Sequence, residues 1–233
     1  RQIPQAHASI MSGKWERNKF KGREVYGKTF GLIGLGNIGK LVAERALGLK
    51  LNVIAYDPFL SKEAADRLGV ELVSLDDLLK RSDIITIHTP LTPETKDLLN
   101  KDSLQKTKKG VMIINCARGG VVNEKDIAEA IKSGHVGGCA FDVFVNEPPE
   151  EGNPLLGLEE NIVFTPHLGA STEEAQTKVG LAIADQIVDF LTNGVVKNAV
   201  NMPSVSLDVL KTIGPYLTLA EKLGSLLGQL SKG

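Results

Sequence analysis

Short runs of hydrophobic residues alternate with longer amphipathic stretches along most of this chain. The runs are rich in Val and Ile, and the stretches between them, about 10 to 15 residues long, place apolar residues at helical spacing. This alternation is typical of repeated β-α-β units, and nearly continuous apolar runs suit parallel strands that are buried on both faces. It predicts an α/β fold with a doubly wound parallel sheet, whose strands lie near residues 29–34, 52–57, 84–88, 111–116, 138–143 and 162–165.

Capping residues predict where several helices begin and end. Ser74 and Asn123 each stand directly before an apolar pattern with helical spacing, as N-cap residues do. Ser171, three residues before Glu174, predicts a capping box at the start of a long helix. Gly194 is the expected end of that helix, because glycine adopts the left-handed conformation that often terminates helices.

The two ends of the chain depart from the repeating pattern. Residues 1–20 combine a polar, helix-like stretch with Trp15 in a charged setting, where an exposed tryptophan would indicate a partner surface. Residues 216–230 have the spacing of an amphipathic helix. We expect the sheet domain to occupy residues 1–200, and residues 201–233 to form a linker and helix that lead into a further domain.

Composition and charge narrow the class of protein. With 27 basic and 28 acidic residues, the net charge of −1 gives no field that would gather nucleic acid or an anionic membrane. The apolar runs are far shorter than the roughly 20 residues needed to span a bilayer. Cys116 and Cys139 lie in strand-like runs without metal-binding spacing, which suits a reducing compartment. We therefore expect a cytoplasmic protein without a metal site.

A glycine-rich segment, GLGNIG at residues 34–39, directly follows the first predicted strand and opens a helix. In the Rossmann dinucleotide-binding motif, Gly34 would allow the tight turn, Gly36 would let the backbone approach a pyrophosphate, and Gly39 would allow close packing of helix on strand. The helix N-terminus would also offer free N–H groups to the phosphates. A structural turn that binds nothing is the alternative, and the motif alone leaves both open.

Asp57 ends the second predicted strand, 18 residues after Gly39. The expected spacing of a ribose-binding acid is roughly 20 residues. A carboxylate there would accept hydrogen bonds from the ribose hydroxyls and repel a 2′-phosphate, by on the order of 4 kcal/mol before solvent screening. Asp57 therefore predicts NAD as the cofactor, and a simple turn cap is the alternative.

Three polar residues, Arg118, Glu147 and His167, each follow the end of a later predicted strand. Ligands of open parallel sheets bind at these carboxyl ends. Arg118 suits a carboxylate ligand, because two parallel N–H donors match two oxygens. His167 can take up or release a proton near neutral pH. Taken singly, each has an ordinary alternative: a surface salt bridge for Arg118, a solvated loop charge for Glu147 and a structural role for His167.

Four motifs together resemble the successive signatures of the D-2-hydroxyacid dehydrogenases. They are GLGNIG (34–39), NCARGG (115–120), FDVFVNEPP (141–149) and PHLGAST (166–172). The likeness runs from residue 1 to about residue 201. Within the family, residues 1–6, 14–17 and 169–172 are most similar to the phosphoglycerate dehydrogenases.

The resemblance implies a catalytic triad that faces the nicotinamide ring. His167 would be the acid and base, Glu147 would orient it and stabilise its protonated form, and Arg118 would bind the substrate carboxylate and polarise the carbonyl. The implied reaction oxidises 3-phosphoglycerate to 3-phosphohydroxypyruvate in serine biosynthesis. The implied NAD contacts are Gly34, Gly36, Asn37, Ile38, Gly39, Asp57, Thr89, Cys116, Ala117, Arg118, Asp142, His167, Gly169 and Ala170, with Asp142 receiving the nicotinamide amide.

The resemblance also implies partners and alternatives. Family members place a substrate domain largely before the position of Arg1, so we expect this chain to be part of a longer protein and to turn over poorly alone. The segment around Trp15 resembles the one through which the nucleotide domains form homodimers. A glyoxylate or hydroxypyruvate reductase, and an NADH-sensing scaffold similar to transcriptional corepressors, are alternatives that the same three polar residues allow.

Overall fold

The structure, a computed structural model, describes residues 2–158, 161–201 and 207–231. Its residue contacts divide the chain into two units, Arg1–Gly169 and Ala170–Gly233. The first unit contains the sheet and the glycine-rich turn. The second contains two helices and is described by itself.

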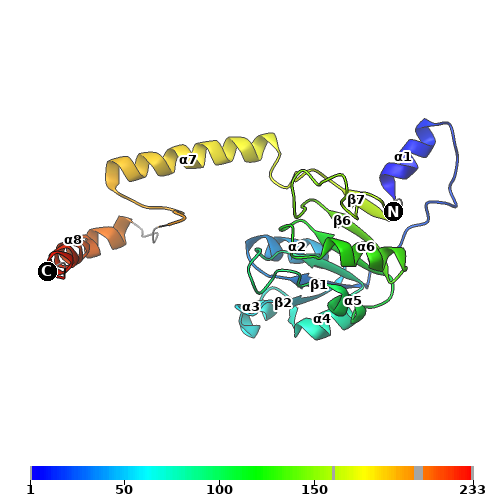
Figure 1. Cartoon of the computed structure of the whole chain (residues 1–233), viewed down its shortest axis with the longest axis horizontal. Coiled ribbons are helices and arrows are strands. Elements are labelled where there is room, and N and C mark those ends of the chain that lie inside the picture. Colours follow the sequence, from blue (N-terminus) through cyan, green and yellow to red (C-terminus); the bar gives the residue numbers. More distant parts are fainter. Residues whose placement is uncertain (1, 159–160, 202–206, 232–233) are drawn as a thin grey trace. The chain divides into compact units, whose positions relative to one another are not determined.

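A seven-stranded, fully parallel sheet forms the centre of the first unit (Figure 1), in the order β3-β2-β1-β4-β5-β6-β7. All six predicted strands are confirmed to within two residues at either end, whereas β3 was not predicted because two residues give no hydrophobic pattern. The strands are β1 (Thr29–Ile33), β2 (Asn52–Tyr56), β3 (Glu71–Leu72), β4 (Ile84–Ile87), β5 (Val111–Asn115), β6 (Val136–Phe141) and β7 (Ile162–Phe164).

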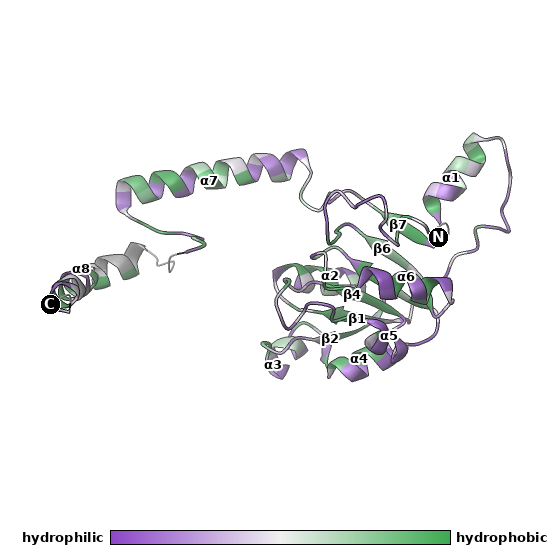
Figure 2. Ribbon diagram, viewed as in Figure 1, coloured by the Kyte–Doolittle hydropathy of each residue, from purple (hydrophilic) through white to green (hydrophobic). Residues whose placement is uncertain are grey.

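Helices cover both faces of the sheet, which confirms the doubly wound class. One core cluster joins Leu32 to small residues of two helices, and the other joins Ile33 to residues of three. Consecutive residues of β1 therefore point into opposite layers, which explains why its apolar run is continuous. The first layer contains α2 (Asn37–Gly48) and α3 (Lys62–Asp66), and the second contains α4 (Leu75–Arg81), α5 (Lys101–Gln105) and α6 (Glu124–Lys132). The strands are mainly hydrophobic in Figure 2.

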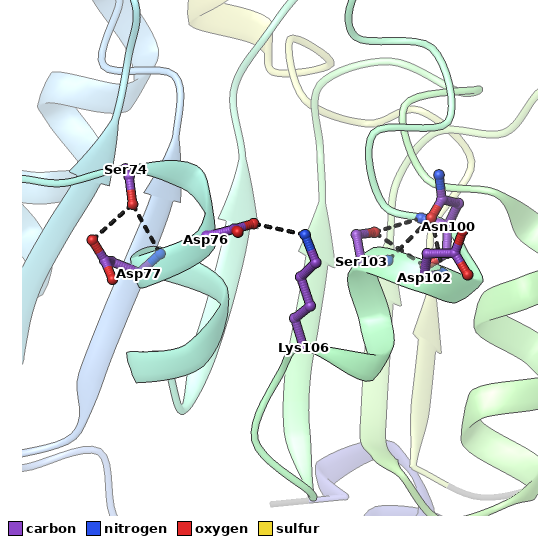
Figure 3. A network of polar contacts seen from close by, with 7 residues as sticks. All are labelled: Ser74, Asp76, Asp77, Asn100, Asp102, Ser103 and Lys106. Atoms are coloured by element: carbon purple, nitrogen blue, oxygen red, sulfur yellow. Dashed lines mark hydrogen bonds and ion pairs between the residues drawn. The ribbon is translucent and has the colours of Figure 1, made fainter.

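Polar side chains cap the N-termini of α4 and α5 in the second layer (Figure 3). Ser74 Oγ accepts the N–H of Asp77 at 3.1 Å, as predicted, and Asn100 caps α5 in the same way. Lys106 Nζ lies 2.8 Å from Asp76 Oδ1 and joins the neighbouring helices α4 and α5 through an exposed ion pair. Water screens such an exposed pair, so the packed apolar side chains do most to hold this layer in place.

The N-terminal segment carries α1 (Ile3–Met11), and a connection without helix or strand leads from it to β1. Trp15 lies outside α1 and is 82% exposed. The side chains of Ile10 and Met11 are exposed as well. The first unit therefore presents several large apolar side chains close to its N-terminus.

The second unit consists of α7 (Glu173–Asn193) and α8 (Leu207–Leu230). Gly194, with φ +64°, ends α7 as predicted. The predicted cap is wrong by one residue: Thr172, rather than Ser171, accepts the N–H of Ala175. Thr172 stands directly before the first helical residue and has the extended backbone of a cap.

The C-terminal helix is longer than the sequence pattern predicts. It begins at Leu207 instead of residue 216 and continues through Pro215, a residue type that usually ends or kinks a helix. Residues 202–206 of the predicted linker lie outside the described residues. No helix within the described ranges is long and apolar enough to cross a membrane.

Candidate active site

The glycine-rich turn lies between β1 and α2, at the carboxyl end of the sheet, where β1 adjoins β4. The chain winds in opposite directions from these two neighbouring strands, and ligands of open α/β sheets bind at such a switch point. Gly34 has φ +93°, and a Cβ there would lie 2.7 Å from the carbonyl oxygen of His88. At Gly39 a Cβ would lie only 2.2 Å from the carbonyl oxygen of Gly34. Both positions thus require glycine for packing.

Gly36 differs from the other two glycines, because an added Cβ would meet no atom within 4 Å. It is the N-cap of α2, and no side chain caps the helix there. Asn37 and Ile38 in the first turn are exposed. The backbone is therefore open at the point where the motif would receive a pyrophosphate, although binding itself stays a prediction.

Asp57 braces the same turn. Its Oδ2 accepts the N–H of Leu35 at 2.8 Å, and its Oδ1 accepts the N–H of Phe59 at 2.9 Å. Asp57 therefore caps the turn, as the alternative interpretation predicts. This role does not exclude the ribose interpretation, because each carboxylate oxygen can accept a second hydrogen bond.

Thr89 lies beside the turn, just after β4. Its hydroxyl oxygen is buried and has no hydrogen-bond partner among the described residues, and its methyl group would lie 2.8 Å from a Cβ at Gly34. An unpaired buried hydroxyl is costly unless a ligand satisfies it. The open backbone at Gly36, the spare acceptors of Asp57 and this hydroxyl fit a dinucleotide.

A compact loop after β5 presents Arg118. The buried side chain of Asn115 holds this loop, because its Nδ2 donates to the carbonyl of Arg118 at 3.0 Å and its Oδ1 accepts the N–H of Ala117 at 3.1 Å. A Cβ at Gly119 would lie 1.8 Å from the carbonyl oxygen of Phe144, so the loop lies against the segment after β6. The exposed guanidinium of Arg118 donates to the Ala117 carbonyl at 2.6 Å.

Cys116 in this loop is a thiol at neutral pH. Partial burial of the sulfur, together with the negative charge of Asp142, raises its pKa above the ordinary value. A nucleophilic cysteine needs the opposite shift, towards the thiolate. The environment of Cys116 thus suits a backbone contact better than covalent chemistry.

Asp142 holds the segment that carries His167. The Asp142 side chain is almost fully buried, and its Oδ1 accepts the hydroxyl of Thr165 at 2.5 Å and the N–H of Leu168 at 2.8 Å. Its Oδ2 accepts the N–H of Gly169 at 3.0 Å. Burial pushes the pKa of Asp142 upwards, but these hydrogen bonds outweigh burial and leave the pKa below its ordinary value.

These contacts surround a strained residue. His167 has φ +54°, a left-handed conformation that is uncommon for residues other than glycine, and its N–H donates to the carbonyl of Asp142 at 3.0 Å. Asp142 therefore holds the side chain of Thr165 and the backbone of the three residues from His167 to Gly169. One acceptor position on its Oδ2 remains for the predicted nicotinamide amide.

His167 and Glu147 form a direct pair. Nδ1 of His167 lies 2.7 Å from Oε2 of Glu147, whose Oε1 accepts the N–H of Phe144 at 3.0 Å. The hydrogen bond from His167, and next the one from Phe144, hold the pKa of Glu147 below its ordinary value. An ionised carboxylate only accepts hydrogen bonds, so Nδ1 carries a proton and Nε2 is left for a substrate.

The pair borders a pocket of about 420 Å³. Its apolar lining includes Phe144, Leu156 and Phe164. Phe144 and Phe164 stack edge to face with ring centroids 5.6 Å apart. The His167–Glu147 pair thus lies beside a preformed apolar cavity, as polar groups at small-molecule sites commonly do.

The structure brings together some of the predicted residues and not others. His167 and Glu147 touch, whereas the guanidinium of Arg118 contacts its neighbour Ala117. Ala170 belongs to the second unit. Sequence reasoning missed Thr165, whose signal was a hydroxyl at the end of an apolar strand directly before the histidine motif.

Residues 1–169 match the family model described as "D-isomer specific 2-hydroxyacid dehydrogenase, NAD binding domain". The D-3-phosphoglycerate dehydrogenase of Archaeoglobus fulgidus is 52% identical over 226 residues, which cover 97% of this chain and 43% of that protein. The enzyme of the same name from Methanocaldococcus jannaschii is 48% identical over 234 residues and 44% of its length. The chain thus spans less than half of these relatives.

Among solved structures, a glyoxylate reductase from Paecilomyes thermophila superimposes with a TM-score of 0.78 and 33% identity, over 86% of this chain and 60% of that one. The NAD-dependent formate dehydrogenase from Staphylococcus aureus, solved in complex with NAD, gives a TM-score of 0.76 and 32% identity, over 88% of this chain and 62% of that one.

Proposed function

The chain belongs to the D-isomer specific 2-hydroxyacid dehydrogenases and carries their NAD-binding domain, and we propose that it serves hydride transfer between NAD and C2 of a D-2-hydroxy acid. The observation that carries the proposal is the contact between His167 and Glu147 at the carboxyl end of the sheet that presents the glycine-rich turn. The names of the sequence relatives favour 3-phosphoglycerate as substrate and 3-phosphohydroxypyruvate as product, a step of serine biosynthesis.

The roles of the residues follow from the chemistry. NAD, when bound, supplies the carbon that accepts or returns the hydride. His167 takes the hydroxyl proton through Nε2 during oxidation and returns it during reduction, while Glu147 keeps the proton on Nδ1 and stabilises the cationic ring. Arg118 binds the substrate carboxylate through its paired N–H donors.

The proposal also assigns residues that contact NAD. The open turn at Gly36 holds the pyrophosphate, with Asn37 and Ile38 in the first turn of α2. Asp57 binds the adenosine ribose with its spare acceptors, and Thr89 finds the partner that its buried hydroxyl lacks. Other assigned contacts are Cys116, Ala117 and Arg118 after β5, Asp142 at the nicotinamide amide, and His167, Gly169 and Ala170.

Calorimetric titration of the 233-residue chain with NADH tests this proposal. We expect saturable binding with one site per chain, because the turn, Asp57 and Thr89 all belong to the first unit. Absence of binding at millimolar NADH would contradict the proposed cofactor site. Because the chain spans less than half of the relatives' length, steady-state turnover should be far below that of an intact homologue, and equal turnover would contradict this expectation.

A second candidate is a glyoxylate or hydroxypyruvate reductase, which the similarity to the solved glyoxylate reductase favours. NADH oxidation with 3-phosphohydroxypyruvate, hydroxypyruvate and glyoxylate separates the two. Preference for the phosphorylated substrate supports a phosphoglycerate dehydrogenase, and equal or better use of glyoxylate supports the reductase.

We also propose that residues 1–200 form one domain and that residues 201–233 form a linker and helix. We propose further that the chain forms a homodimer through its N-terminal segment. The exposed side chains of Trp15 and Met11 support the dimer, since large apolar groups favour burial. Light scattering at micromolar concentration should give twice the chain mass, and a monomeric mass would contradict the dimer.

The cytoplasm is the compartment that we propose, because two free cysteines suit its reducing conditions.

A further inference from the structure

Glu124 lies in the first turn of α6, outside the triad, and its carboxylate reaches both ends of the loop of residues 145–153. Its Oε1 accepts the N–H of Val145 at 2.7 Å, and its Oε2 accepts Nδ2 of Asn153 at 2.7 Å. Glu147 lies within this loop. A single side chain therefore ties both ends of the segment that presents Glu147 to the rigid end of a helix.

The helix itself does not need this side chain as a cap. Asn123 is the N-cap of α6, and its Oδ1 accepts the N–H of Asp126 at 3.1 Å. Both oxygens of Glu124 contact the loop instead. A carboxylate in the first helical turn is also favoured by the helix dipole, which helps to hold Glu124 at this position.

The far end of the loop is equally well defined. Oδ1 of Asn153 accepts the N–H of Leu155 at 2.9 Å, which leaves Nδ2 directed towards Glu124. Leu155 is completely buried in the core. Because hydrogen bonds to an ionised carboxylate are stronger than neutral ones, the Glu124 contacts connect the loop firmly to α6 and to the core.

We propose that Glu124 is a positioning residue for Glu147 and, through it, for the ring of His167. The proposal rests on the proposed function, in which Glu147 must meet Nδ1 of His167. Catalytic groups need placement to within about 0.5 Å, and the loop that carries Glu147 is exposed over much of its length. Its two Glu124 contacts bracket Glu147 and restrict the movement of its backbone.

The test is carbon-13 NMR titration of the Glu147 carboxyl in the 233-residue chain without cofactor. The groups that face this carboxyl are the His167 ring, the Phe144 N–H and the charge of Asp142. In Glu124→Ala we expect the pKa of Glu147 to rise towards its ordinary value, because the loop drifts from His167. Glu124→Gln keeps one acceptor and should give a smaller rise, and Glu129→Ala, on the exposed side of the same helix, should give none.

An unchanged Glu147 titration in folded Glu124→Ala overturns the proposal. If the alanine variant does not fold, Glu124→Gln decides, and a titration equal to that of the parent chain is the overturning result. NADH titration of the parent chain, run in parallel, tests the proposed cofactor site separately from the role of Glu124. If the parent chain does not bind NADH, the cofactor site is contradicted. The Glu147 titration alone decides whether Glu124 positions Glu147.

Discussion

Nδ1 of His167 and Oε2 of Glu147 lie 2.7 Å apart although the two residues are 20 positions apart in the sequence. The contact follows from the pairing of β6 with β7, because parallel neighbours end at the same edge of the sheet and direct their following loops towards each other. The same edge brings the glycine-rich turn after β1 into the carboxyl face. The contact between His167 and Glu147 thus depends on the order of the strands in the sheet.

The first prediction concerns acid stability. The pKa of Glu147 is lowered chiefly by the hydrogen bond from His167. A lowered folded pKa stabilises the fold above the ordinary carboxyl pKa, and this contribution is lost as pH falls through the folded value. In His167→Gln we therefore expect a smaller loss of unfolding free energy between neutral and acidic pH than in the parent chain. The difference should be below about 1 kcal/mol, because the pair is about half exposed.

Urea unfolding at several pH values measures this difference. His7→Gln is the matched control, since His7 is an exposed histidine of α1. Identical pH profiles for His167→Gln and the parent chain would show that the contact does not lower the Glu147 pKa in solution.

The second prediction concerns Asp142. In Asp142→Asn an amide N–H₂ group replaces one acceptor oxygen, so that it faces an N–H of Leu168 or Gly169. Because the side chain is only 6% exposed, we expect a loss of about 1–3 kcal/mol in unfolding free energy. The lowered pKa of Asp142 adds a pH dependence: the stabilisation is present above the ordinary pKa and is lost as pH falls through the folded value.

Urea unfolding at neutral pH tests the second prediction. Asp66→Asn, at an exposed position of α3, makes the same chemical change without a buried contact. Thr165→Val removes one donor to Asp142 and should cost about 1 kcal/mol. Equal stability of Asp142→Asn and Asp66→Asn would exclude the anchoring role.

Much of the fold could be predicted because its signals are local. β1 and β5 are continuous apolar runs, and the turns that follow them carry Gly34 and Arg118. The exceptions have physical causes: β3 is too short to give a pattern, and α8 continues through Pro215.

For the site, the sequence predicts only the types of the residues and the strands that they follow. Arg118, Glu147 and His167 each follow a strand, so their common edge could be inferred. The partners that hold them could not, because the contact of Glu124 with Val145 joins residues 21 positions apart. At the sequence level Glu124 is an ordinary acid in a first helical turn.

The third prediction separates two glycines of one motif. Gly39→Ala would place a Cβ 2.2 Å from the carbonyl oxygen of Gly34, so we expect it to lower the unfolding free energy by about 1–3 kcal/mol. Gly36→Ala meets no atom within 4 Å and should change stability by less than about 0.5 kcal/mol.

For NADH binding, in contrast to stability, we expect the absence of a side chain at Gly36 to matter. A Cβ there points into the space that we assign to the pyrophosphate, so we expect Gly36→Ala to bind NADH at least about tenfold more weakly, which corresponds to about 1.4 kcal/mol. Calorimetric titration and thermal unfolding of the same samples measure both quantities. Unchanged affinity in Gly36→Ala would place the pyrophosphate elsewhere.

The fourth prediction concerns the choice between NADH and NADPH. Asp57 has a spare acceptor on each oxygen, and its negative charge should repel a 2′-phosphate, so we expect the parent chain to prefer NADH by roughly tenfold or more. Asp57→Ala should weaken NADH binding and narrow the preference, whereas Asp66→Ala, an exposed control, should change neither. Calorimetric titration with both cofactors measures the ratio. Because Asp57 also braces Leu35, a loss of affinity for both cofactors with an unchanged ratio would mean that Asp57 serves the turn and not the ribose.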